Sequence, residues 1–130
     1  MKTVIRLGTE KEEIRMIFDQ IGTPTFAGDL ASTILQIIEI TSDDSSKFIP
    51  GVYHFSNEGV TSWYDFAKEI IDLGGLKARV LPIETTEYPL PAPRPQYSVM
   101  NKKKIRDTFG IDIRHWKDAL RECMGVGVTR

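Results

Sequence analysis

The sequence predicts an α/β fold built from helices and a few short strands, and three stretches support this prediction. Residues 14–18 alternate apolar and polar side chains and then end in an apolar run, which is typical of a half-buried strand. Residues 26–40 repeat leucine and isoleucine at helical spacing. Residues 51–56 are rich in β-branched and aromatic side chains and give the clearest strand prediction.

The composition indicates one ordinary globular domain. The chain has 130 residues, of which 41% are hydrophobic and 27% are charged, a balance typical of folded proteins. The net charge of −1 argues against nucleic acid as a partner, because nucleic-acid binding needs a basic surface. The longest apolar runs are too short to span a bilayer, so we expect no membrane partner.

The single cysteine, Cys123, excludes an internal disulfide and suits a reducing compartment. It falls on the apolar side of the last helical segment, where we expect a core residue. No charged region followed by an apolar run opens the chain at Met1, so we expect no signal peptide. These features predict a cytoplasmic location.

The turn between the first strand and the long helix, residues 19–31, is the most informative stretch. Gly22 and Pro24 punctuate the chain there. Thr25 is a candidate N-cap, and Asp29 is expected in the first helical turn, where the helix dipole favours a negative charge. α/β proteins commonly bind ligands where a strand ends before a helix N-terminus. A plain strand–turn–helix joint is the alternative interpretation.

The other elements are bounded by turn and cap residues. In the first half, residues 1–12 contain the end of a helix, which we expect Gly8 to terminate. The long helix should have an apolar face of Leu30, Ile34, Ile37 and Ile38, followed by a polar loop at 41–46. The next helix should be capped by Ser62 and stopped by Gly74 and Gly75. In the second half we expect an edge strand at 79–83 and a short strand at 97–100. We then expect a helix capped by Asn101 and ended by Gly110, and a last helix at 116–124. Residues 125–130 should form a frayed tail.

Few residues carry a catalytic or metal-binding signal. Tyr64 and Lys68 have the Tyr-x-x-x-Lys spacing of an acid–base pair, but no glycine-rich nucleotide loop precedes them, so we favour a structural interpretation beside an apolar stripe. His54 and His115 have no second ligand at metal spacing. We therefore predict no catalytic residue and no metal site in this chain.

The proline-rich run at 88–95 has two interpretations. It is either a polyproline II ligand for an aromatic groove or a stiff loop that crosses the domain, and we favour the loop. Arg94 lies between two prolines, which pre-positions its guanidinium for a bidentate phosphate contact; a plain surface arginine is the alternative. The lysines at 102–104 are expected to form a solvated face.

Taken together, these stretches resemble the C-terminal part of the dTDP-4-dehydrorhamnose reductases, a family of extended short-chain dehydrogenases/reductases. The most specific matches are Asp-Gln-x-Gly-x-Pro-Thr at 19–25 and Ala-x-Arg-Pro at 92–95. The matching runs keep one order along nearly the whole chain: 2–8, 18–25, 28–31, 51–56, 61–67, 82–83, 88–89, 94–95, 97–98 and 109–110.

The resemblance implies that residues 1–130 are a fragment: the C-terminal substrate-binding lobe with the last elements of an NAD(P)-binding Rossmann-type core. The Rossmann nucleotide-binding half, with its catalytic residues, would be missing. The parent enzyme would reduce dTDP-4-dehydro-L-rhamnose to dTDP-L-rhamnose with NADPH or NADH. The fragment would bind no cofactor and would be inactive alone.

The resemblance also assigns candidate substrate-binding residues for a dTDP-sugar nucleotide. Arg94 would contact the diphosphate, and Gln20, Thr23 and Thr25 would line the sugar side or brace the loop that does. Truncation would leave apolar surface or an open edge on the strands at 14–18 and 51–56, and self-association into a homo-oligomer would cover it. An autonomous interaction module that uses the proline-rich 88–95 segment is the alternative function.

Overall fold

The structure, a computed structural model, describes residues 1–88 and 91–127 and confirms the α/β class. The elements in chain order are α1 (Lys2–Glu10), β1 (Glu13–Ile17), β2 (Ile21–Gly22), α2 (Ala27–Asp43), the 3-10 turn η1 (Ser45–Lys47), β3 (Thr61–Ser62), α3 (Trp63–Leu73), β4 (Arg79–Ile83), the 3-10 turn η2 (Thr85–Glu87), α4 (Lys103–Phe109) and α5 (Trp116–Cys123). Among these residues, no helix is both long enough and apolar enough to cross a lipid bilayer.

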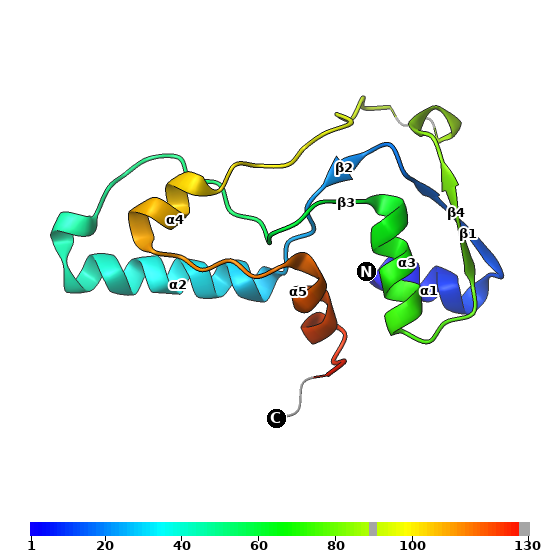
Figure 1. Cartoon of the computed structure of the whole chain (residues 1–130), viewed down its shortest axis with the longest axis horizontal. Coiled ribbons are helices and arrows are strands. Elements are labelled where there is room, and N and C mark those ends of the chain that lie inside the picture. Colours follow the sequence, from blue (N-terminus) through cyan, green and yellow to red (C-terminus); the bar gives the residue numbers. More distant parts are fainter. Residues whose placement is uncertain (89–90, 128–130) are drawn as a thin grey trace.

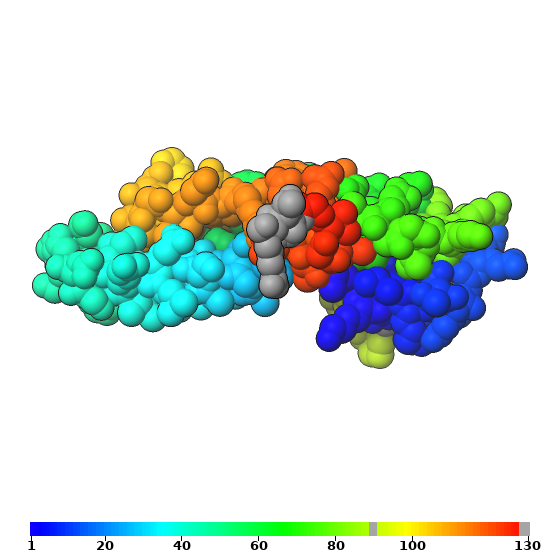
Figure 2. Space-filling view, turned by 90° about the horizontal axis from the view of Figure 1, so that it is seen from below, coloured from blue at the N-terminus to red at the C-terminus, as the bar shows by residue number. Residues whose placement is uncertain are grey.

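The molecule is elongated, with one group of elements at each end (Figure 1). Helices α2 and α4 lie together at one end, and α1, α3, β1 and β4 lie at the other, with α5 between them. The space-filling view shows the same division (Figure 2). Each group has its own apolar core.

The first core lies around the parallel pair β1 and β4, whose register runs from Glu13 opposite Arg79 to Ile17 opposite Ile83. Helix α3 begins where the sequence predicts, because the Ser62 hydroxyl oxygen accepts a hydrogen bond from the Asp65 amide at 2.9 Å. The buried members of this core are Val4, Ile14, Ala67, Ile70, Ile71, Ala78, Trp116 and Leu120. The strands predicted at 14–18 and 79–83 are thus confirmed.

The second core lies between α2 and α4. Its buried members are Ile105, Phe109, Ile111 and Ile113, with Ile37, Ile40, Tyr53 and Phe55 packed against them. Of the apolar face predicted for the long helix, only Ile37 points into this core, while Leu30, Ile34 and Ile38 are exposed. On the segments where open apolar surface was predicted, 14–18 and 51–56, the exposed large apolar side chains are Phe18 and Val52. Self-association through apolar surface stays a prediction.

The strand predicted at 51–56 is wrong. Residues 52–57 follow an irregular path without a strand ladder, because their side chains pack on a helix instead of a neighbouring strand. The Tyr53 ring lies 5.1 Å from the Phe109 ring, and both Tyr53 and Phe55 contact the second core. β propensity describes a side chain that suits a half-buried surface, and a helix surface also satisfies that requirement.

Four smaller predictions are also corrected. Gly8 lies inside α1, where its missing side chain leaves room for Ile71. Cys123 is exposed at the end of α5.

Lys102 is buried and does not belong to a solvated face. Its ammonium group donates to the Asn57 carbonyl oxygen at 3.1 Å and pairs with Glu58, and these partners compensate for its burial. The strand predicted at 97–100 is reduced to one bridge at Tyr97. The tail predicted to fray falls partly on residues 128–130, which lie outside the described residues.

A buried polar junction around Asn57 joins the two cores. The side-chain oxygen of Asn57 accepts from the Phe26 amide at 2.8 Å, and its nitrogen donates to Asp29 at 2.6 Å. Asn57 therefore caps α2, and the prediction that Thr25 does so is wrong. Asp29 lies in the first turn of α2, as predicted, and also accepts two hydrogen bonds from Arg114, at 2.6 and 2.9 Å.

Asp29 and Arg114 both remain charged within this junction. Burial opposes ionisation of Asp29, but hydrogen bonds from Arg114 and Asn57 outweigh it and lower the pKa of the carboxyl group. The same ion pair raises the pKa of the Arg114 guanidinium, against the effect of burial. The pair therefore stays ionised at neutral pH and fixes residue 114 beside the N-terminus of α2.

We predict that Asp29→Asn lowers the free energy of unfolding by about 1–2 kcal/mol at pH 7, because it removes a charge-assisted pair that solvent partly screens. The folded state lowers the pKa of Asp29, so it binds fewer protons than the unfolded chain. This stabilisation is therefore present above about pH 4 and is lost as the pH falls through the lower folded pKa.

Urea unfolding of the wild type and the variant between pH 2 and pH 7 measures this difference. Asp43→Asn, which neutralises an exposed carboxylate at the other end of α2, is the matched control. A difference that is absent at pH 7, or that persists unchanged at pH 2, contradicts the assignment.

Candidate functional site

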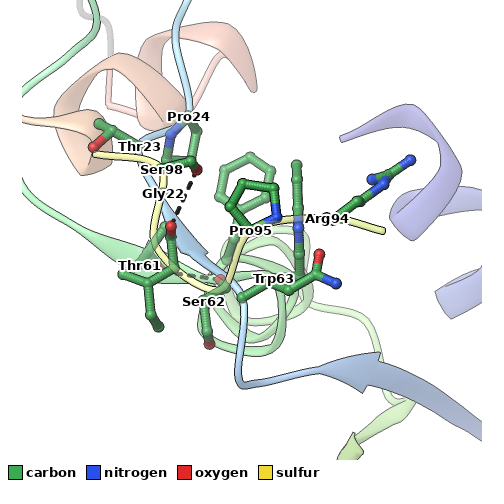
Figure 3. A pocket seen from close by; sticks show the side chains of 12 residues that line it. Gly22, Thr23, Pro24, Thr61, Ser62, Trp63, Arg94, Pro95 and Ser98 are labelled. Carbon is green, nitrogen blue, oxygen red and sulfur yellow. Dashed lines mark hydrogen bonds between the residues drawn. The ribbon is translucent and has the colours of Figure 1, made fainter. Parts of the chain in front are cut away.

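The candidate site is a pocket of about 280 Å³ where the turn after β1 meets the start of α3 and the segment 94–98 (Figure 3). It is lined by Gln20, Ile21, Gly22, Thr23, Pro24, Thr61, Ser62, Trp63, Phe66, Arg94, Pro95 and Ser98. Segments from three distant parts of the sequence thus form its walls. This is the strand-end position at which the sequence predicted a ligand site.

Backbone pairing around β2 holds these walls together. β2 pairs antiparallel with β3, with Ile21 opposite Ser62. On its other side, the Ile21 amide donates to the Gln96 carbonyl oxygen at 2.7 Å, and the Ser98 amide donates to the Ile21 carbonyl oxygen at 2.8 Å. β2 therefore lies between β3 and residues 96–98, which places Arg94 beside the pocket.

Gly22 allows this close approach. A Cβ atom on Gly22 would lie only 2.9 Å from the Ser98 hydroxyl oxygen, closer than such atoms pack. The glycine that sequence reasoning assigned to a turn thus also brings the segment at 96–98 against β2.

Three of the four predicted substrate-binding residues line this pocket, namely Gln20, Thr23 and Arg94. Thr25 lies outside the set of lining residues and is exposed beside the start of α2. The Thr23 hydroxyl donates to the Gly59 carbonyl oxygen at 2.7 Å, so its proton braces the turn. Gly59 has φ of +84°, a conformation that favours glycine.

Gln20 is held by a chain of hydrogen bonds behind the pocket. Its side chain is only 5% exposed, and its Nε2 donates to the Thr85 hydroxyl oxygen at 3.1 Å. Thr85 in turn donates from its hydroxyl and its amide to the same Asp19 carboxylate oxygen, at 2.7 and 2.9 Å. The hydrogen bond from the Thr85 hydroxyl is the main cause that lowers the pKa of Asp19, against desolvation. Asp19 is therefore a carboxylate at neutral pH.

A larger hollow of about 780 Å³ adjoins the pocket and shares Gln20, Trp63, Phe66 and Arg94 with it. Trp63 is the first residue of α3 and is 48% exposed. In Figure 3 the Arg94 side chain extends past Trp63, away from Thr23 and Pro24. A ligand longer than the pocket can therefore continue past the indole ring into the larger hollow.

Other predicted features lie away from the pocket. Tyr64 and Lys68 are not among its lining residues. The His115 side chain caps α5 by accepting from the Lys117 amide at 3.2 Å. Within residues 1–88 and 91–127, no group of three or more histidine, cysteine, aspartate or glutamate side chains could hold a metal ion. The proline-rich segment includes residues 89 and 90, which lie outside the described residues, so the interaction-module hypothesis stays untested.

A dinucleotide cofactor is held in α/β folds by a glycine-rich loop before a helix N-terminus. The sequence contains no Gly-x-Gly-x-x-Gly loop. The strand–turn–helix joint from β1 to α2 could offer amide groups to a phosphate, but the Asn57 side chain caps the Phe26 amide there and the Asp29 carboxylate occupies the first turn. The Asn57 amide and the Asp29–Arg114 ion pair therefore take up part of this joint.

The fold and the pocket define a ligand-binding lobe of the α/β class. A family model described as the RmlD substrate binding domain matches residues 1–127, and the chain belongs to this family. The spore coat polysaccharide biosynthesis protein SpsK of Bacillus subtilis is 40% identical over 122 residues, which cover 94% of this chain and 40% of that protein.

Two solved structures are similar to the chain. A dTDP-4-dehydrorhamnose reductase from Clostridium acetobutylicum matches with a TM-score of 0.84 and 38% identity, over 95% of this chain and 42% of that one. A dTDP-4-dehydrorhamnose reductase from Bacillus anthracis, in complex with NADP, gives the same TM-score and identity over 93% of this chain and 41% of its own. The chain thus spans about 40% of the length of these relatives.

We predict that Gly59→Ala lowers the free energy of unfolding by about 1–3 kcal/mol more than Gly75→Ala does. Both glycines have positive φ, so the backbone strain is common to both variants. A Cβ atom at Gly59 would lie 2.2 Å from the His115 ring, whereas nothing lies within 4 Å of one at Gly75. Urea unfolding of the two variants measures the difference, and equal destabilisation would argue against the tight packing at Gly59.

Proposed function

We propose that this chain is the sugar-nucleotide-binding part of a dTDP-4-dehydrorhamnose reductase. The observation that carries the proposal is the convergence of Arg94 with the Gln20–Thr23 turn on one pocket, in a chain that belongs to the RmlD substrate-binding family. The whole enzyme would reduce dTDP-4-dehydro-L-rhamnose to dTDP-L-rhamnose, within the synthesis of nucleotide sugars for cell-surface polysaccharides. A cytoplasmic location stays a prediction.

The residues at the pocket suit a sugar nucleotide. The Arg94 guanidinium can pair with the diphosphate through two parallel hydrogen bonds, a geometry that lysine cannot reproduce. The exposed indole of Trp63 offers a flat apolar surface beside it, on which a base or sugar ring can pack. Gln20 lines the same pocket and supplies an amide group that Thr85 holds in place.

The reduction itself needs groups that the residues of this chain do not supply. NAD(P)H supplies the hydride in such reductases, and residues 1–130 contain no Gly-x-Gly-x-x-Gly loop to hold its phosphates. We therefore assign cofactor binding and the proton donor to the part of the reductase that this chain does not match. The contribution of residues 1–130 is to bind and orient the sugar nucleotide.

We predict that Arg94→Ala weakens binding of dTDP by about 10- to 100-fold, because a charge-assisted hydrogen bond is worth about 1.5–3 kcal/mol. Arg94→Lys should give an intermediate affinity, since it keeps the charge but loses the bidentate geometry. Isothermal titration calorimetry measures the affinities. Arg79→Ala, which removes an exposed arginine paired with Glu13, is the matched control. Unchanged affinity in Arg94→Ala would contradict the assignment of Arg94 to the diphosphate.

We also predict that the chain alone shows no detectable binding of NADPH, because it has no phosphate-binding glycine loop. Titration of NADPH with the protein, followed by cofactor fluorescence, measures this directly. Micromolar binding would contradict the proposed division of roles.

A further inference from the structure

The hydrogen bonds behind Gln20 determine which way its carboxamide points. The Thr85 hydroxyl has a single proton, and it donates that proton to the Asp19 carboxylate at 2.7 Å. Towards Gln20, the Thr85 oxygen can therefore only accept a hydrogen bond. Gln20 must present its NH₂ group to Thr85, which turns its carbonyl oxygen, Oε1, the other way.

The Gln20 oxygen opens onto the pocket. Within the described part of the chain, no group donates a hydrogen bond to this oxygen, and every fully buried side-chain nitrogen or oxygen has a partner. Oε1 therefore keeps some accessible surface. Because the side chain is almost entirely buried and lines both the pocket and the adjoining hollow, that surface faces these hollows.

We propose that Gln20 Oε1 accepts a hydrogen bond from a neutral donor of the bound sugar nucleotide, a hydroxyl or N–H group, and that Asp19 and Thr85 are positioning residues that hold the carboxamide in this orientation. The inference rests on the proposed function. In this arrangement Arg94 binds the diphosphate of the ligand, and Gln20 Oε1 accepts a hydrogen bond from a neutral donor group beside it.

This arrangement favours one ligand polarity. An unconstrained glutamine can rotate its amide and offer either a donor or an acceptor. Here the charged Asp19 fixes the Thr85 proton, and Thr85 fixes the Gln20 NH₂ group. Rotation of the amide would lose the bond to Thr85 or would require the Thr85 proton to leave Asp19. A ligand that places an acceptor at this position would face the lone pairs of Oε1, and its affinity would fall.

The first experiment is an NMR titration of the ¹⁵N-labelled 130-residue chain with dTDP and with dTDP-glucose. Gln20→Met keeps the side-chain length but removes the acceptor, and we expect about tenfold weaker binding of dTDP-glucose. An equal loss for dTDP assigns the donor to the thymine or ribose, and a loss confined to dTDP-glucose assigns it to a sugar hydroxyl.

The outcomes separate this inference from the proposed function. In one outcome, the wild type binds both ligands, Arg94→Ala weakens this binding, and Gln20→Met binds both ligands as tightly as the wild type. That outcome overturns the role of Gln20 and leaves the proposed function standing. Wild-type protein that binds neither ligand at millimolar concentration overturns both.

The second experiment tests the positioning residues. Thr85→Val removes the hydroxyl but keeps the amide that donates to Asp19, so we expect an intact fold and about three- to tenfold weaker binding. Thr85→Ser should restore the affinity, and the side-chain amide signals of Gln20 should move in Thr85→Val alone. Thr86→Val, on the same η2 turn and exposed, is the matched control. Wild-type affinity in Thr85→Val overturns the positioning role.

Discussion

The buried amide of Asn57 is the constraint on which the rest of this structure depends. Its side chain has no exposed surface, and a buried polar group left without a partner costs about 1–3 kcal/mol. Its side chain pairs with the start of α2 and with the carbonyl oxygen of residue 114, and its backbone carbonyl oxygen accepts from Lys102. Each of these segments must therefore meet at Asn57, and the two apolar cores are held in one arrangement by polar contacts.

The pocket follows from this arrangement. Two residues beyond Asn57, the Gly59 carbonyl oxygen holds the Thr23 hydroxyl, which ties the turn after β1 to the junction. β2 then pairs on one side with β3 and on the other with the segment at 96–98. The pocket walls are thus positioned by backbone pairing and by buried hydrogen bonds, which is the rigidity that a binding site requires.

Local signals in the sequence predicted much of the fold. Ser62 caps α3, and Gly110 ends α4 in the left-handed region. Each of these signals depends on residues within one or two turns of each other. The strands at 14–18 and 79–83 were also predicted from their own residues, although the sequence did not show that they pair with each other. The prediction of a strand at 51–56 was wrong because a strand needs a neighbouring strand to pair with. The sequence does not show that residues 53 and 55 pack against a helix instead.

The site was predicted less completely, for the same reason. The motifs at 19–25 and 92–95 identified Gln20, Thr23 and Arg94, which the structure brings to one pocket. Nothing in the sequence linked Asp19 to Thr85, because these partners lie 66 positions apart. The sequence predicted Thr25 as the cap of α2, but the side chain of Asn57, 31 positions after Phe26, accepts the hydrogen bond from the Phe26 amide. Contacts of this range arise only from the tertiary fold.

The most direct test of the account is a map of the amide and indole signals that move when dTDP-glucose is added to the ¹⁵N-labelled chain. The account predicts that the shifts concentrate at Gln20–Thr23, Thr61–Trp63 and Arg94–Ser98, including the indole N–H of Trp63. Shifts that concentrate instead on α4 or on the exposed face of α2, with these residues unmoved, would contradict it.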